Sequence, residues 1–171
     1  MKNPKNFRPH TFQSLIQKPV HFLAYGLGSG LIHPAPGTWG TLMGIVLFVP
    51  LFSWLGQTGM LILSALGFAL GCYLCGQTAE DLGVHDFGEI VWDEIIGVWL
   101  VLLLAPKALW AWSGWGTYVL AFLLFRLFDI VKPTPIRWFD KHLKGGLGIM
   151  VDDVLAAGYA IIITYLLAWL F

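Results

Sequence analysis

Long apolar runs separated by short polar segments dominate this chain and predict membrane-embedded helices. A hydrocarbon layer about 30 Å thick requires about 20 residues of apolar helix, with 17 near the lower limit. Five stretches approach that length, at residues 40–55, 59–75, 95–110, 116–131 and 154–171. Pro50 and Pro106 are expected to kink or end the first and third of these spans. The pattern predicts an all-α, polytopic membrane protein with about five membrane-embedded helices.

The N-terminal part of the chain follows a different pattern. Residues 14–27 are apolar but carry Lys18, Pro19 and His21, which favours an interfacial or partly buried helix. We therefore expect a cytoplasmic N-terminal segment with an interfacial helix and loop at residues 1–38, followed by a helical membrane catalytic domain at 39–171. The polar, proline-broken residues behind Lys2, Lys5 and Arg8 do not resemble the apolar core of a cleaved signal peptide.

Composition supports a membrane protein. Hydrophobic residues make up 57% of the chain and charged residues 12%, against about 45–50% and about 25% in average soluble proteins. These values exclude an ordinary soluble globule, a disordered chain and a nucleic-acid binder. The formal net charge is zero, so only the placement of charge is informative. Two cysteines, Cys72 and Cys75, cannot form a disulfide framework and are expected to pack within the second span.

The charged residues predict an orientation. With a cytoplasmic N-terminus, the five spans leave only Lys107 near the outer face, and most other basic residues lie inside, as the positive-inside rule requires. These inner residues are Lys2, Lys5, Arg8, Lys18, Lys132, Arg137, Lys141 and Lys144. The same arrangement places every Asp and Glu on the inner side, together with His10, His21, His33, His85 and His142. The positive-inside rule makes no demand on acids, so their one-sided distribution requires a separate cause.

The most acidic segment reads EDLGVHDFGEIVWDEIIG and covers residues 80–97. Read as a helix that enters the third span, it places Asp86, Glu89 and Asp93 on one face, with Glu94 about 100° further round. Acids at a helix start also complement the macrodipole, which is the simpler explanation of any one of them. Four acids within nine residues at the mouth of an apolar span favour a metal site instead.

A second acidic pair, Asp152-Asp153, is expected to open the fifth span. Helix capping would explain it alone. A charge at mid-membrane costs roughly 2.5–3.5 kcal/mol, so both acidic groups should stay at the interface, where they can meet. Oxygen ligands without Cys or His at ligand spacing suit Mg²⁺ better than Zn²⁺.

A basic cluster follows the fourth span. Arg126 and Asp129 are three residues apart, and Lys132 precedes a proline that should stop the helix. Arg126 could pair with Asp129 or reach the headgroups; alternatively, Arg126 and Lys132 grip a phosphate. Arg137, Lys141 and Lys144 are expected to face anionic headgroups.

A loop rich in glycine and proline precedes the first span, at residues 26–30 and 34–41. Its backbone amides could bind an anion, and Thr38 could cap the helix that follows. Alone this signal is weak, because the loop matches neither a dinucleotide-binding nor a Walker A motif.

Four runs together resemble the phosphatidylglycerophosphatase A family. They are PGTWGT at 36–41, IVWDEIIG at 90–97, FRLFDIVKP at 125–133 and GGLGIMVDD at 145–153. They occur in order and span residues from about 26 to 160. The resemblance implies an all-helical, Mg²⁺-dependent phosphatase of the bacterial inner membrane. Its substrate would be phosphatidylglycerophosphate, and its products phosphatidylglycerol and inorganic phosphate.

The residues and the resemblance lead to one mechanistic hypothesis. Asp93, Glu94, Asp152 and Asp153 hold one or two Mg²⁺ at the cytoplasmic interface, with Glu89 as a possible extra ligand. Arg126 and Lys132 bind the terminal phosphate, assisted by the loop at Gly37 and Thr38. Asp129 orients Arg126 or carries a proton. Water attacks the phosphorus, with an Asp nucleophile as the alternative.

Three other functions are compatible with parts of this pattern. A small transporter or channel would place its polar groups near the bilayer midplane, whereas these acids crowd one end. A phosphatidyltransferase of the CDP-alcohol type would share an acidic, Mg²⁺-dependent interface, but its spaced aspartate signature is absent. A purely structural protein would tolerate Asp93→Asn.

Overall fold

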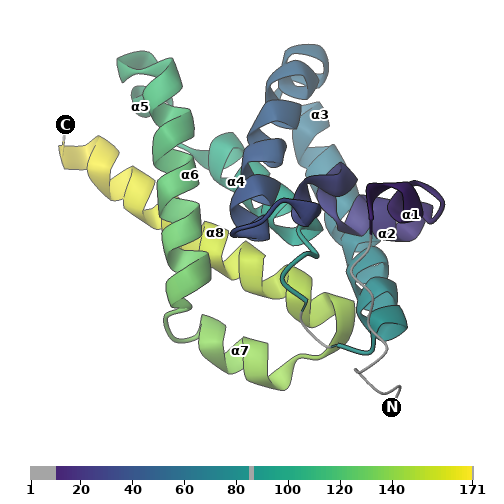
Figure 1. The fold of residues 1–171 in the computed structure, drawn as a ribbon. Coiled ribbons are helices and arrows are strands. Elements are labelled where there is room, and N and C mark those ends of the chain that lie inside the picture. The colour runs from purple at the N-terminus through teal and green to yellow at the C-terminus, as the bar shows by residue number, and fades with distance from the viewer. Residues whose placement is uncertain (1–10, 85–86, 171) are drawn as a thin grey trace.

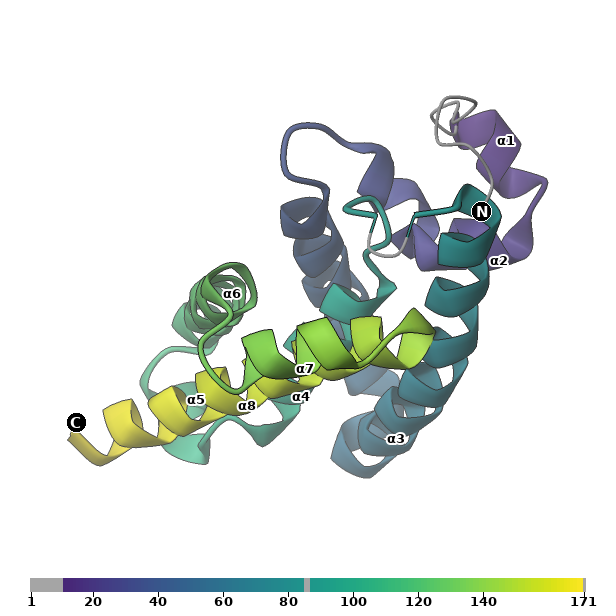
Figure 2. The ribbon, with the colours of Figure 1, turned by 90° about the horizontal axis from the view of Figure 1, so that it is seen from below.

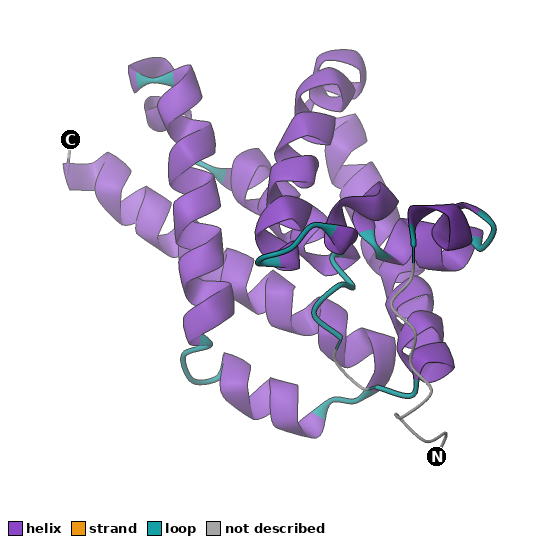
Figure 3. Cartoon of the chain, in the orientation of Figure 1, coloured by secondary structure: helices purple, strands orange, loops and turns teal. Residues whose placement is uncertain are grey.

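The protein is helical throughout the part that the structure describes. The structure is a computed structural model, and it describes residues 11–84 and 87–170. Within these ranges no strand occurs, which confirms the predicted all-α class (Figures 1 and 3). The elements are α1 (Phe12–Ile16), α2 (Pro19–Ala24), the 3₁₀ segment η2 (Gly26–Leu31), α3 (Pro36–Leu82), α4 (Trp92–Leu104), α5 (Lys107–Trp112), α6 (Gly114–Val131), α7 (Ile136–His142) and α8 (Gly145–Leu170).

Helix α3 is a hairpin whose two arms are the first two predicted spans. Its chain reverses at Gly56, where φ is 65° and ψ is −176°, a conformation that favours glycine (Figure 1). Gly44 on the first arm and Gly67 on the second both lie against α4, so the arms clamp that helix. The first arm continues past Pro50, which we expected to kink or end it, and ends at Gly56 instead. Proline removes one backbone donor, which a packed membrane helix tolerates.

Helix α4 forms the core of the bundle. Most of its residues are buried, among them Ile95, Val98 and Leu102. It ends before Pro106, as predicted, so the expected third span at 95–110 is divided into α4 and α5. With 13 residues, α4 is about 20 Å long, shorter than a hydrocarbon layer of about 30 Å. The Gln57 side-chain amide donates to the Leu103 carbonyl near its C-terminal end, at 3.3 Å.

Three described helices, α3, α6 and α8, are long and apolar enough to cross a membrane. Helix α6 closely matches the predicted fourth span. Helix α8 starts at Gly145, well before the predicted residue 154, because the glycine-rich run is helical rather than a loop. The five predicted spans therefore correspond to two arms, one broken segment and two whole helices, and the structure does not confirm five crossings.

The N-terminal region contains short elements in place of the one helix expected at 14–27. Pro19 begins α2, which separates it from α1, and η2 follows. The buried His21 Nε2 lies 2.8 Å from Asp81 Oδ2 and fixes α2 to the end of α3. Helix α3 begins at Pro36, so the proposed boundary at residue 38 falls within a helix. Several residues used above lie outside the described ranges: Lys2, Lys5, Arg8, His10, His85, Asp86 and Phe171.

Close contact between α8 and the second arm of α3 makes a testable prediction about stability. A Cβ on Gly146 would lie 1.8 Å from the Cys72 carbonyl oxygen, whereas one on Gly158, further along α8, would meet nothing within 4 Å. Gly146→Ala should therefore destabilise the fold by about 1–3 kcal/mol. Gly158→Ala is the matched control, expected to be neutral or stabilising by up to about 1 kcal/mol. Thermal unfolding in detergent measures both, and equal midpoints would contradict the packing described here.

Candidate active site

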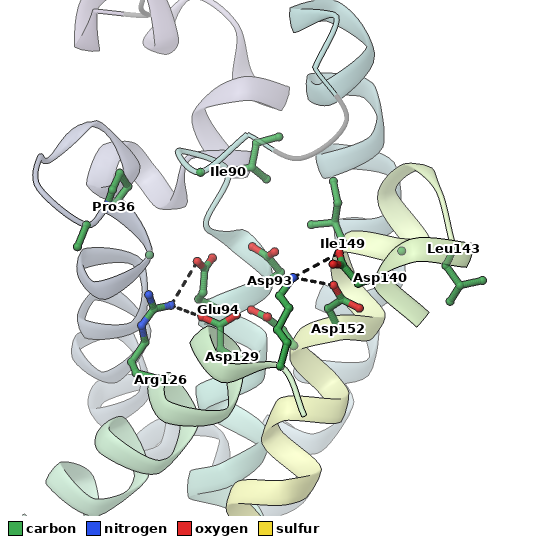
Figure 4. Close-up of a pocket in the computed structure, with 16 residues that line it drawn as sticks. Pro36, Ile90, Asp93, Glu94, Arg126, Asp129, Asp140, Leu143, Ile149 and Asp152 are labelled. Atoms are coloured by element: carbon green, nitrogen blue, oxygen red, sulfur yellow. Dashed lines mark hydrogen bonds and ion pairs between the residues drawn. The ribbon is translucent and has the colours of Figure 1, made fainter. Parts of the chain in front are cut away.

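Eight charged side chains gather in one pocket (Figure 4). The pocket lies beside α7, at the end of the bundle opposite the turn of α3 (Figure 1). Its volume is about 290 Å³. The first turn of α4, the end of α6, helix α7, the N-terminal part of α8 and the start of α3 surround it. The lining residues are Ala35, Pro36, Gly37, Gly88, Ile90, Asp93, Glu94, Arg126, Asp129, Lys132, Asp140, Leu143, Gly148, Ile149, Asp152 and Asp153.

Two tryptophans fix the rotation of α4 and so place its acidic first turn in the pocket. Trp92 Nε1 donates to the Gly67 carbonyl at 2.9 Å, and Trp99 Nε1 donates to the Gly44 carbonyl at 2.7 Å. One bond reaches each arm of α3. Asp93 and Glu94 then lie at the N-terminal end of α4, where the helix dipole favours negative charge.

Three carboxylates form the centre of the site. Asp93, Glu94 and Asp153 each offer an oxygen within 4.8 Å of the others, which brings the two acidic pairs of the sequence together. Asp153 is 3% exposed. Among the described residues, none donates a hydrogen bond to Glu94 Oε2 or Asp153 Oδ2, both of which are buried. Carboxylates held this close without donors repel one another, so the arrangement favours a bound cation.

The charge balance of the pocket leads to the same expectation. Six carboxylates line it, from Asp93, Glu94, Asp129, Asp140, Asp152 and Asp153, against two basic side chains among the described residues. All of these ligand atoms are oxygens, which is the donor set of a hard divalent cation. The residues present therefore fit Mg²⁺.

Arg126 reaches the pocket from the last turns of α6. Its Nη1 contacts Asp129, three residues along the helix, and lies 3.6 Å from Glu94 Oε1 (Figure 4). Its Nε is buried and meets no acceptor within the described part of the chain. On the first arm of α3, a Cβ at Gly37 would lie 2.3 Å from Glu94 Oε1 and 2.8 Å from Arg126 Nη1, so a side chain there would displace these two groups. The guanidinium is thus held against the carboxylates with donor capacity remaining.

Lys132 supplies the second positive charge. It ends α6 in a left-handed conformation, with φ 44° and ψ 65°. Its Nζ lies 2.9 Å from Asp152 Oδ2 and 3.4 Å from Asp140 Oδ1 (Figure 4). Asp152 therefore faces Lys132, whereas its neighbour Asp153 faces the carboxylate cluster.

Glu89 is placed differently from our expectation. Helix α3 ends at Leu82 and α4 begins at Trp92, so Glu89 lies in the loop between them and not on a helical face with Asp93. Its Oε1 lies 3.0 Å from His33 Nε2, and it does not line the pocket. Burial, and the nearby Glu89 carboxylate, raise the pKa of the Tyr25 hydroxyl. The expected ligand role of Glu89 is therefore not supported by its position.

Two further residues differ from the sequence analysis. Thr38 does not cap α3, because the helix begins earlier, at Pro36, with Ala35 as its N-cap, and Thr38 does not line the pocket. Asp140 does line it, although the sequence analysis assigned it no role. Local sequence did not predict this, because Asp140 comes near Lys132 only when α7 packs on α8. Figure 2 shows α7 running alongside α8. Arg137 and Lys144 are exposed, as expected for residues facing headgroups.

The fold and the pocket define a class: a helical membrane protein with a buried carboxylate site that also holds an arginine and a lysine. Residues 22–168 match the family of phosphatidylglycerophosphatase A. A phosphatidylglycerophosphatase A of Haemophilus influenzae is 58% identical over 147 residues, which cover 86% of this chain and 87% of that protein. The chain belongs to the phosphatidylglycerophosphatase A family, and this membership makes it an enzyme of the phosphatase class.

Two more relatives show the range of the family. The phosphatidylglycerophosphatase A of Escherichia coli is 47% identical over 141 residues, covering 82% of this chain and 78% of its own. A protein of Bacteroides thetaiotaomicron, named as a candidate phosphatidylinositol-3-phosphatase, is 37% identical over 148 residues. These residues cover 84% of this chain and 90% of that protein. No solved structure matches this chain.

Proposed function

We propose that this protein hydrolyses phosphatidylglycerophosphate to phosphatidylglycerol and inorganic phosphate, with Mg²⁺, at the cytoplasmic face of the bacterial inner membrane. The observation that carries the proposal is one pocket that joins buried, donor-poor carboxylates with Arg126 and Lys132. The names of the H. influenzae and E. coli relatives supply the substrate.

Arg126 and Lys132 would bind the terminal phosphate. They are the two basic side chains among the described residues that line the pocket, and they approach it from the end of α6. Arg126 offers a planar fork to two phosphate oxygens, and its buried Nε gives it a donor for that purpose. Both charges would stabilise the negative charge that builds up on phosphoryl transfer.

Asp93, Glu94 and Asp153 would hold the divalent cation, with Asp152 beside them. When bound, Mg²⁺ would supply Lewis-acid stabilisation of the phosphoryl oxygens. Among the described residues, Arg126 lies at ion-pair distance from Glu94 of this cluster. The carboxylates that would hold the cation therefore lie next to the guanidinium that would bind the phosphate.

Asp129 would orient Arg126. It contacts Nη1 from the same helix, so it fixes the guanidinium plane before substrate binds.

Attack by water, with a nearby carboxylate taking its proton, is the hydrolytic route; attack by an Asp carboxylate would give an acyl phosphate instead. Oxygen-18 water in a single turnover separates the two, because label appearing first in an enzyme carboxylate excludes direct attack.

The lipid tails would stay in the bilayer during the reaction. Leu127 and Ile130, close to Arg126 on α6, are 51% and 68% exposed, which gives the pocket an apolar neighbouring surface. The basic residues on the pocket side, and Lys107 at the opposite end, support the proposed cytoplasmic orientation.

Phosphate release from phosphatidylglycerophosphate in detergent, with Mg²⁺ and with EDTA, tests the function directly. We expect release that depends on the added cation. Phosphatidylinositol 3-phosphate is the comparison substrate, because the B. thetaiotaomicron relative is named for it; faster release from that lipid would overturn the substrate. Solute movement in liposomes without phosphate release would favour a transporter, and a requirement for a CDP-lipid would favour a transferase.

A further inference from the structure

Asp140 is the pocket carboxylate that the proposed function leaves without a role. It lies on α7, outside the cluster of Asp93, Glu94 and Asp153, and its side chain is 38% exposed. Its Oδ1 lies 3.4 Å from Lys132 Nζ. The question is whether this contact is incidental or holds Lys132 in a working position.

Helix α7 is fixed in place, so the position of Asp140 is set by the fold. Ile136 is fully buried, and Asp140 follows it by four residues on the same face of the helix. The Tyr159 hydroxyl donates to the Thr134 carbonyl at 2.8 Å and holds the turn before α7 on α8. After α7, the Leu143 carbonyl packs closely on Gly148 of α8. A Cβ on Gly148 would lie 2.6 Å from the Leu143 carbonyl oxygen.

Lys132 sits between two carboxylates that come from different helices. Asp140 of α7 and Asp152 of α8 both contact its ammonium (Figure 4). A lysine side chain has a flexible four-carbon stem, so each added partner restricts the direction in which its ammonium points. With Asp140 absent, the shorter contact to Asp152, at 2.9 Å, would draw the ammonium toward α8.

We propose that Asp140 is a positioning residue, which holds the Lys132 ammonium where the terminal phosphate of the lipid binds. The proposal rests on the proposed phosphatase function. Asp140 would act through Lys132 and would not itself touch the phosphate, because like charges repel. Its contribution should therefore vanish in a protein that lacks Lys132.

A double-mutant cycle tests this coupling with purified full-length protein and phosphatidylglycerophosphate. Asp140→Asn should lower kcat/KM about threefold to tenfold, mainly through KM, because partly exposed ion pairs are worth little more. Asp140→Glu should recover at least half of the loss. In a Lys132→Met background, Asp140→Asn should change kcat/KM by less than about 1.5-fold, since coupled residues are not additive. Glu80→Gln, an exposed carboxylate on α3, is the matched control and should stay within twofold of wild type.

Each other outcome overturns the proposal. If Asp140→Asn behaves like Glu80→Gln, the contact is incidental. If it lowers activity equally with and without Lys132, Asp140 acts by another route. If Asp140→Asn does not fold, Asp140→Glu is measured in the wild-type and Lys132→Met backgrounds instead. The proposal then requires that Asp140→Glu change kcat/KM only where Lys132 is present. Absence of phosphate release from the wild-type protein would instead reject the proposed function, so the two failures are distinguishable.

Discussion

Asp153→Asn is expected to abolish phosphatase activity while leaving the protein folded. Asp153 is buried at the centre of the carboxylate cluster, and its Oδ2 has no hydrogen-bond donor among the described residues. The amide would remove one charged oxygen from a site that should hold a divalent cation. We expect kcat to fall about a thousandfold, the upper end of the loss seen when one transition-state-stabilising group is removed.

The thermal stability of Asp153→Asn should stay unchanged or rise, although its activity is lost. Without divalent cations, the amide relieves repulsion between Asp153 and its neighbours Asp93 and Glu94, so the variant should unfold at or above the wild-type temperature. Mg²⁺ should raise the wild-type midpoint more than that of the variant, because a ligand stabilises the state that binds it. An inactive variant with a lower midpoint in EDTA would point to a structural role for Asp153.

Arg126→Lys is expected to cost about a hundredfold in kcat/KM although it keeps the positive charge. The guanidinium now contacts Asp129 and lies 3.6 Å from Glu94 Oε1, while its Nε stays available. An ammonium is a point charge that cannot offer two parallel donors to a phosphate. Steady-state kinetics with phosphatidylglycerophosphate measure the loss.

The second variant for this position separates charge from geometry. Arg126→Ala leaves Glu94 and Asp129 without their shared cation, so it should be less active than Arg126→Lys. Added guanidinium ions should partly restore Arg126→Ala and should not affect Arg126→Lys. Equal activity of wild type and Arg126→Lys would show that only the charge at this position is needed.

The sequence predicted the helical class and the convergence of its two acidic pairs for a simple physical reason. Buried charge is costly in an apolar layer, so Asp93-Glu94 and Asp152-Asp153 had to stay at one end, where the structure brings Asp93, Glu94 and Asp153 together. The length of the apolar runs likewise located both arms of α3. These expectations depend on composition and spacing, which the sequence displays directly.

The positions of single acidic residues in and after the loops were harder to predict. Glu89 matched the helical spacing of Asp93, but Gly83 ends α3 and the chain reaches α4 only at Trp92. The reversal at Gly56, by contrast, lies in the gap between the predicted spans at 40–55 and 59–75 and was located correctly. Asp140 was missed because its contact with Lys132 depends on α7 folding back over α8. The positions of Glu89 and Asp140 both depend on tertiary packing, which the local pattern does not show.

The shortness of α4 gives the hairpin turn of α3 a second role. A helix that stops inside an apolar layer leaves carbonyl oxygens that hydrocarbon cannot satisfy. Gln57, the residue after the reversal, donates its amide to Leu103 in place of water. The turn of α3 therefore satisfies a carbonyl at the C-terminal end of α4. Because α4 is short, the position of this turn also sets the depth at which the carboxylates at the N-terminal end of α4 lie.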